Sequence, residues 1–143
     1  MYFGHVAMYT PDVQRMADFY VKYFGGKIFW DNTGYGMHSI YVGFDEHCYL
    51  ELMQKPEIEA SAYKPGEERE GLTHIAINAE SSARVRELTA QLEKDGYTVL
   101  LQPTDYGTDI FYESCILDPD GNRVEICVHA DVLKAEHEAA QAK

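Results

Sequence analysis

Hydrophobic and polar positions alternate through residues 3–9 (FGHVAMY), which is the pattern of a half-buried β-strand. The spacing then becomes helical in the stretch TPDVQRMADFYVKYFGG. The apolar side chains on the predicted helix face are Val13, Met16, Ala17, Phe19, Tyr20 and Phe24. Thr10 or Asp12 supplies a cap at the start of this helix, and Gly25 and Gly26 end it. The pattern therefore predicts a strand followed by a helix.

Short strand-like runs separated by turn residues follow the helix, and the whole order then repeats. In the first half these runs are KIFWDN, GMHSIYVGF and CYLELMQ. In the second half, a strand at 72–79 precedes a helix that Ser81 or Ser82 caps and that ends near Gly96. The last three strands are TVLLQP, IFYESCILD and RVEICVH. The sequence thus predicts the order β-α-β-β-β twice.

The length of 143 residues suits one α+β domain built from two such modules. Module 1 covers about residues 1–54 and module 2 about residues 72–130. Residues 55–71 are polar, contain two prolines and indicate a linker. Residues 131–143 predict a C-terminal tail helix, either amphipathic or frayed.

The formal net charge of −12 argues against a nucleic-acid partner and against an anionic membrane surface, but it suits a divalent cation. No run approaches the roughly 18 apolar residues of a membrane span, and the first residues lack the features of a signal peptide. Cys48, Cys115 and Cys127 form no C-x-x-C pair. We therefore expect a cytoplasmic chain with reduced, buried thiols.

Each half carries a histidine in its first strand and a glutamate in its last. These residues are His5 and Glu51, then His74 and Glu125, all flanked by apolar neighbours. A carboxylate inside an apolar strand either points to solvent or needs a partner charge or a metal. Two imidazoles and two carboxylates suit an octahedral divalent ion with two water positions left open. The alternative is that the four positions are incidental to a duplication.

The chain resembles the vicinal oxygen chelate superfamily, and within it glyoxalase I and glyoxalase-like proteins. The resemblance spans Gly4 to His129 and rests on GHVAMYTPDVQRMADFYVKYFGG, YVGFDEHCYLELM, GLTHIAI and DPDGNRVEI. It implies paired β-α-β-β-β modules that form a cupped mixed sheet around a metal site. It further implies that the metal ligands, in chain order, are His5, Glu51, His74 and Glu125.

The resemblance also implies an activity, that of a lactoylglutathione lyase. In such enzymes a proton moves between neighbouring carbons of the hemithioacetal of an α-oxoaldehyde and a thiol, through a metal-bound enediolate. Glu125 would be the principal base, Glu51 a ligand and second base, and His5 and His74 fixed ligands. Nickel or cobalt is the expected metal, with zinc or manganese as competitors. A homodimer is expected, with the site either within one chain or shared between two.

Some positions depart from the glyoxalase I pattern. Tyr9 replaces an arginine and Lys55 an asparagine that contact glutathione in such enzymes, and residues 95–122 contain no lysine or arginine. The identity of the thiol therefore stays open. Six aromatic residues either line an apolar pocket or, as is more common, belong to the core: Phe29, Trp30, Tyr35, Tyr106, Phe111 and Tyr112. The alternative functions are an acyl-CoA epimerase-like metalloenzyme and a non-catalytic protein that binds small molecules or drugs.

Overall fold

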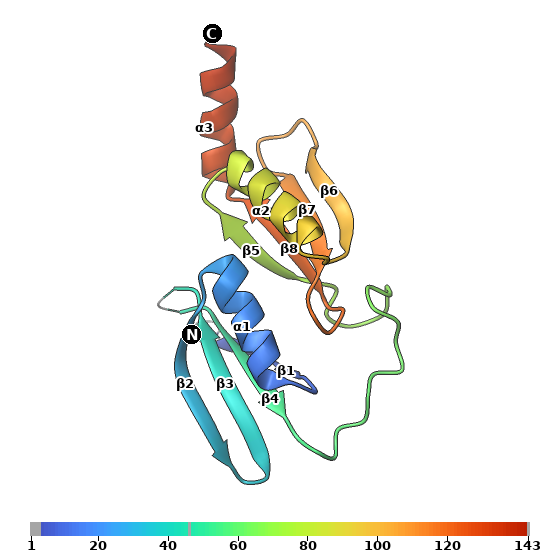
Figure 1. Ribbon diagram of the computed structural model, residues 1–143. Coiled ribbons are helices and arrows are strands. Elements are labelled where there is room, and N and C mark those ends of the chain that lie inside the picture. The colour runs from blue at the N-terminus through green and yellow to red at the C-terminus, as the bar shows by residue number, and fades with distance from the viewer. Residues whose placement is uncertain (1–3, 46, 143) are drawn as a thin grey trace. The chain divides into compact units, whose positions relative to one another are not determined.

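The computed structural model describes residues 4–45 and 47–142. The chain divides into two compact units, Met1–Lys64 and Pro65–Lys143, which we call unit 1 and unit 2. Each unit contains a four-stranded mixed sheet and a helix in the order β-α-β-β-β, so the predicted repeat is confirmed (Figure 1). Residue 3 of the first predicted strand and residue 143 of the predicted tail lie outside the described residues.

Unit 1 forms its sheet in the strand order β1-β4-β3-β2. Its elements are β1 (His5–Tyr9), α1 (Val13–Phe24), β2 (Lys27–Gly34), β3 (Met37–Gly43) and β4 (Tyr49–Gln54). β1 is parallel to β4, whereas β2, β3 and β4 are antiparallel to their neighbours. This topology places the first strand of the unit directly beside its last strand.

Unit 2 repeats that topology with the strand order β5-β8-β7-β6. Its elements are β5 (Ile75–Ala79), α2 (Ser82–Lys94), β6 (Val99–Asp105), β7 (Tyr112–Leu117), β8 (Arg123–Val128) and α3 (Ala130–Gln141). α3 is attached to the unit: Leu133 is buried, and the Glu136 carboxylate accepts a hydrogen bond from the Ser82 backbone N–H at 3.1 Å. The tail, predicted as an amphipathic or frayed helix, is helical over Ala130–Gln141 and buries Leu133.

In each unit one helix covers one face of the sheet (Figure 1). In unit 1 the buried core residues are Val13, Met16, Ala17, Phe19, Tyr20, Tyr23, Ile40, Val42, Leu50 and Leu52. In unit 2 they are Val85, Leu88, Leu92, Tyr112, Ile116, Leu117, Val124, Ile126, Val128 and Leu133. The strand residues that alternate with this core point to the opposite side of each sheet.

We call that opposite side the open face of each unit. The open face of unit 1 includes His5, Ala7, Tyr9, Tyr41, Tyr49, Glu51 and Met53. The open face of unit 2 includes Ala76, Asn78, Glu113, Cys115, Arg123, Glu125 and Cys127. All of these side chains are exposed or half-buried. Among the residues that the structure describes, no helix is long and apolar enough to cross a membrane.

The helix caps follow the sequence closely. Asp12 caps α1 and accepts a hydrogen bond from the Arg15 backbone N–H at 3.0 Å, and Ser81 caps α2 in the same way. On the core face of α1, Tyr23 is buried and Phe24 is only half-buried, so the predicted face was wrong at its last position. Phe24 is the last residue of α1, where the chain turns away at Gly25.

Several strand boundaries differ from the sequence prediction by one to three residues, and two of these differences concern a turn and the site. β2 continues to Gly34 because its hairpin turn consists only of Tyr35 and Gly36, which both have positive φ values, 54° and 73°. Such two-residue turns match the right-handed twist of the flanking strands and let pairing continue up to the turn. β5 begins at Ile75, so His74 lies immediately before the strand instead of inside it.

The prediction of buried thiols was wrong. The three cysteines are free, but Cys48 is exposed and Cys115 and Cys127 are half-buried. Cys48 lies in the turn before β4, where no core is available. Cys115 and Cys127 belong to the open face of unit 2, because the neighbouring positions Ile116, Ile126 and Val128 take the core side.

Candidate functional site

His5 and Glu51 meet on the open face of unit 1. The parallel pairing of β1 with β4 sets Ala7 opposite Glu51 and His5 opposite Tyr49. His5 Nε2 and Glu51 Oε2 are 3.3 Å apart. The carboxylate is the more enclosed partner, since the Glu51 side chain is 15% exposed and the His5 side chain 45%. The predicted association of these two residues across the first and last strands is therefore present.

His74 and Glu125 form the corresponding pair in unit 2. Ala76 is opposite Glu125, so His74 precedes that position by two residues, as His5 precedes Ala7 in unit 1. His74 Nε2 and Glu125 Oε2 are 3.4 Å apart, and the two side chains are 42% and 20% exposed. The duplicated fold thus repeats the same pair, the same two atoms and nearly the same distance.

Each pair fits two neighbouring ligands of one divalent ion. Two such ligands, each about 2.1 Å from the ion, are roughly 3.0–3.4 Å apart for angles between octahedral and tetrahedral. The separations of 3.3 and 3.4 Å lie at the upper end of this range, and beyond the ordinary lengths of N–H···O hydrogen bonds. Imidazole nitrogen with carboxylate oxygen is also a donor set that nickel, cobalt, zinc and manganese accept.

The His5–Glu51 pair and the His74–Glu125 pair each supply two donors. No group of three or more His, Cys, Asp or Glu side chains that could hold a metal ion occurs among residues 4–45 and 47–142. A divalent ion of this type takes four to six ligands. One unit therefore offers half of the donor set that the sequence predicts.

The pair in unit 1 lies beside a tyrosine. Tyr41 on β3 is directly opposite Glu51. Burial and the neighbouring Glu51 carboxylate raise the pKa of Tyr41. The Tyr41 ring also meets the rings of His5, Phe29 and Trp30 edge-on, at centroid distances of 5.6, 5.5 and 5.4 Å.

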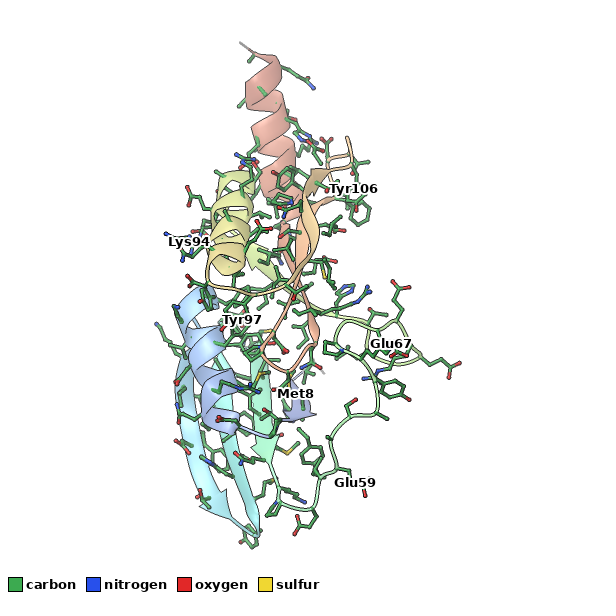
Figure 2. All side chains as sticks on the ribbon, turned by 45° about the vertical axis from the view of Figure 1, so that its right-hand side comes forward. Met8, Glu59, Glu67, Lys94, Tyr97 and Tyr106 are labelled. Carbon is green, nitrogen blue, oxygen red and sulfur yellow. The ribbon has the colours of Figure 1, made fainter. Side chains whose placement is uncertain are left out.

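The pair in unit 2 has thiol and carboxylate neighbours. Burial, with the charge and hydrogen bonding of Glu125, raises the pKa of Cys127 to about 11. Burial and the Glu125 charge also raise the pKa of Glu113, while His74 and a hydrogen bond with Tyr106 act in the opposite direction. Tyr106 directly follows β6, in the connection to β7 (Figure 2). The surroundings of Glu125 are thus less aromatic and more acidic than those of Glu51.

Three neighbours of the pairs were not found from the sequence, namely Tyr41, Glu113 and Cys127. The signal that exists is strand alternation, which puts residues two apart on the same face. Alternation alone does not tell which residue of one strand lies opposite which residue of the next. Only the register of the sheet sets Tyr41 opposite Glu51 and Glu113 opposite Cys127.

The six candidate aromatic residues divide between surface and core. Tyr112 is buried, as the core interpretation expects, whereas the other five are exposed: Phe29, Trp30, Tyr35, Tyr106 and Phe111. Of these, Phe29 and Trp30 contact Tyr41 beside the His5–Glu51 pair. Tyr9 lies at the end of β1 on the same open face and is also exposed.

Comparisons with known proteins agree with this fold. The sequence profile of the Glyoxalase/Bleomycin resistance protein/Dioxygenase superfamily matches residues 2–126. A search of curated proteins finds no significant match.

Several solved structures share the fold at low sequence identity. The trypanothione-dependent glyoxalase I of Leishmania major is 21% identical, with a TM-score of 0.71 over 96% of this chain and 93% of that one. A glyoxalase/bleomycin resistance/dioxygenase domain from Frankia sp. EAN1pec is 16% identical, with a TM-score of 0.74 over 90% and 98%. Glyoxalase I from Zea mays is 22% identical, with a TM-score of 0.70 over 89% of this chain and 44% of the longer maize chain. The profile match covers most of the sequence, and the chain therefore belongs to the glyoxalase/bleomycin resistance protein/dioxygenase superfamily.

Proposed function

We propose that this protein is a metal-dependent, glyoxalase I-like lyase that acts on the hemithioacetal of an α-oxoaldehyde and a thiol. The observation that carries the proposal is the repeated pair, in which a histidine Nε2 and a glutamate Oε2 lie 3.3 Å apart in unit 1 and 3.4 Å apart in unit 2. A superfamily that generally binds a divalent metal provides the context for this donor set.

The proposed ligand set joins both pairs: His5, Glu51, His74 and Glu125. The two pairs come either from one chain or from two copies of the chain in a homodimer. Nickel or cobalt is the metal we favour, with zinc or manganese as alternatives. A divalent ion held there supplies Lewis-acid stabilisation of negative charge on two adjacent substrate oxygens.

The chain's own contribution to the chemistry is proton transfer. Glu125 takes the proton from the carbon that bears the sulfur and returns it to the neighbouring carbon, which was the carbonyl carbon. The C–H bond at the first carbon breaks and a C–H bond at the second forms. The hydroxyl proton also moves from the oxygen of the first carbon to the oxygen of the second, so the hemithioacetal becomes a 2-hydroxy thioester without net oxidation. One carboxylate that first accepts and then donates the carbon-bound proton suffices for the transfer between the carbons. Glu51 is a ligand and a second candidate base.

The two open faces offer few cationic partners for glutathione. Its two carboxylates favour charge-assisted partners such as arginine. At the end of β1 the open face of unit 1 instead presents Tyr9, and the open face of unit 2 carries Glu113 near Glu125. The Arg123 guanidinium on that face is already bound to the Gly66 carbonyl at 3.0 Å and to Glu68 at 3.2 Å. The experiment below therefore compares two kinds of substrate thiol, namely glutathione and a thiol without carboxylates.

The test is turnover by protein that has been stripped of metal and reloaded with nickel, cobalt, zinc or manganese. Methylglyoxal is supplied with glutathione or with cysteamine, and thioester formation is followed. We expect turnover that requires the metal and that falls at least about 100-fold in Glu125→Gln, the size of a lost general base. Glu113→Gln is the matched control, since it removes a carboxylate from the same open face but not from the proposed ligand set.

Two results would change the proposal in different ways. Tight metal binding without thioester formation from either thiol would reject glyoxalase I chemistry and direct attention to acyl-CoA epimerisation, which shares the proton transfer next to a thioester. A protein that binds none of the four metals would reject the metal site and favour a binding function.

A further inference from the structure

The C-terminal helix α3 contacts the rest of unit 2 along one face. Leu133 is buried and Val132, Glu136 and His137 are half-buried, whereas residues 138–142 are all exposed. These four positions follow helical spacing and therefore lie on one side of the helix. Figure 1 shows the distal turns of α3 projecting beyond the sheet of the unit. Along the described part of α3, His137 is thus the last position that is shielded by the rest of the unit.

His137 lies between two carboxylates, one at each nitrogen of its ring. Nδ1 is 3.0 Å from Asp109 Oδ1, a hydrogen-bond distance, and Nε2 is 3.4 Å from Asp105 Oδ2, an ion-pair distance. Asp105 is the last residue of β6, and Asp109 lies in the connection between β6 and β7, residues 106–111. The ring therefore joins α3 to the end of a strand and to the loop that follows it.

The connection that carries these carboxylates has hydrogen bonds of its own. Asp105 Oδ1 accepts from the Gly107 backbone N–H at 2.8 Å, so Oδ2 is the oxygen that faces His137. The Thr108 hydroxyl oxygen accepts from the backbone N–H groups of Ile110 and Phe111 at 3.3 and 3.2 Å. Since none of these bonds involves α3, the loop holds both aspartates in place without help from the histidine.

The groups in contact with the ring are anionic, and they come from outside its own helix. On α3, Lys134 is one turn before His137, while Glu136 accepts a hydrogen bond from the Ser82 backbone N–H and Glu138 is exposed. On α2, Arg86 is one turn after Ser82, and its guanidinium donates to the Tyr112 hydroxyl group at 2.8 Å. The two aspartates therefore dominate the electrostatic surroundings of the imidazole.

This geometry separates the two charge states of His137. A neutral imidazole has one N–H group, so it donates to one aspartate and turns a lone pair toward the other. An imidazolium donates from both nitrogens and places its charge between the two carboxylates. The hydrogen bond to Asp109 raises the pKa of His137 above its ordinary value of 6.5, the Asp105 carboxylate raises it further, and burial acts in the opposite direction.

We propose that His137, Asp105 and Asp109 form a pH-dependent latch, which fastens the distal part of α3 to the β6–β7 connection when the imidazole is doubly protonated. Because the pKa is raised in the folded protein, the latch is complete below about pH 6.5 and is lost as the pH rises through that raised pKa. Leu133 and the hydrogen bond between Glu136 and Ser82 then still hold the first turns of the helix. The latch goes beyond the proposed function, since it involves neither the proposed metal ligands nor the lyase reaction.

Carbon-detected NMR of the full-length protein tests the latch between about pH 5 and pH 9. The ring shifts of His137 follow its protonation, and the Cα shifts of residues 138–142 follow the helicity of the distal end. We expect His137 to titrate above pH 6.5. With the same midpoint, the distal residues should lose at least about half of their helical shift, because one helical turn without tertiary contacts is only marginally stable.

Substitutions assign this titration to the three residues. His137→Gln keeps a polar side chain that cannot become charged, and it should leave the distal helicity low and independent of pH. Asp109→Asn should lower the midpoint of His137 toward its ordinary value, and Asp105→Asn should lower it by less because its contact is longer. Glu138→Gln is the matched control. It removes a carboxylate from the next position of α3, which does not face His137 in a helix, and should leave the coupled titration unchanged.

Three results would each overturn the inference. These are a His137 midpoint at or below pH 6.5, distal helicity that does not follow this midpoint, and the wild-type pH dependence persisting in His137→Gln. Metal binding and turnover enter none of these measurements. The latch can therefore fail while the proposed lyase stands, and the lyase can fail while the latch stands.

Discussion

The open faces of the two units share a fold and a histidine–glutamate pair, with an alanine opposite each glutamate, but the neighbours on the other side of each glutamate differ. In unit 1 the pair lies among aromatic rings, with Tyr41 in contact with Phe29 and Trp30. In unit 2 it lies among thiols and a second carboxylate, Cys127 and Glu113. A duplication that kept only the pair and the register has left the two glutamates in different environments.

Because their surroundings differ, Glu51 and Glu125 are expected to have different roles. Glu51 lies opposite the aromatic side chain of Tyr41, whereas Glu125 lies opposite the thiol side chain of Cys115. This difference supports the proposed roles, in which Glu51 is a ligand and Glu125 is the principal base. Variants in equivalent positions of the two units test this distinction.

The largest expected effect is a difference in kcat between the Glu125→Gln and Glu51→Gln variants. With saturating nickel, Glu125→Gln lowers kcat at least about 100-fold because the base is lost. Glu51→Gln weakens nickel binding more strongly but, with saturating metal, keeps kcat within about tenfold of the wild type. Steady-state kinetics over a nickel titration measures both quantities. If the two variants lose kcat equally, the units are functionally equivalent and the distinction between them fails.

The helix-facing side of the two units is expected to be alike. Leu52 follows Glu51 and Ile126 follows Glu125, and both side chains are buried under the helix of their own unit. Leu52→Ala and Ile126→Ala each leave a cavity and lower the free energy of unfolding by roughly 2–5 kcal/mol. Chemical denaturation of the metal-free proteins measures this. A cost below 1 kcal/mol for either variant would show that its unit is loosely packed.

The contrast between the two sides of each sheet also explains which features could be predicted from the sequence and which could not. Alternation, helical spacing and the repeat were enough to predict both β-α-β-β-β units, two cap candidates for each helix that include Asp12 and Ser81, and the two histidine–glutamate pairs. Such features depend on residues close together in the chain, or on a repeat that marks equivalent positions. The helix-facing core is of this kind, except at the end of α1, where Tyr23 is buried instead of the predicted Phe24.

The neighbours of each pair depend on strand register, which no short stretch of the sequence determines by itself. A shift of one residue between β3 and β4 would turn Tyr41 to the helix side and bring another side chain toward Glu51. The thiols illustrate the same limit: Cys115 and Cys127 have apolar neighbours in sequence, yet alternation sends them to the open face. Hydrophobic composition predicts a strand, but not which of its two faces becomes the core.

A smaller effect distinguishes the thiols of the two units. Because the pKa of Cys127 is raised to about 11, its thiolate fraction at pH 8 is about 100-fold below that of an ordinary cysteine. The pKa of Cys48 is also raised, by burial and the Asp45 charge, but Cys48 is exposed. We expect iodoacetamide to label Cys48 well before Cys127 at pH 8, and Cys127 labelling to increase up to about pH 11. Peptide mass spectrometry follows each site. Glu125→Gln should speed labelling of Cys127, because the Glu125 charge no longer opposes the thiolate.

The smallest effect concerns the hairpins of the two units. The β2–β3 turn has two residues, and Tyr35 in it adopts a left-handed conformation (φ 54°) while its side chain is fully exposed. The β6–β7 connection is longer and needs no such residue, since Gly107 takes the positive φ there. Tyr35→Asn creates the Asn-Gly pair that this kind of turn favours, and it should raise the free energy of unfolding by about 0.5–1 kcal/mol. Because Tyr35 is remote in register from Glu51, nickel affinity should not change. Chemical denaturation with and without nickel measures both quantities, and destabilisation by Tyr35→Asn would show that the tyrosine makes a contact that its exposure conceals.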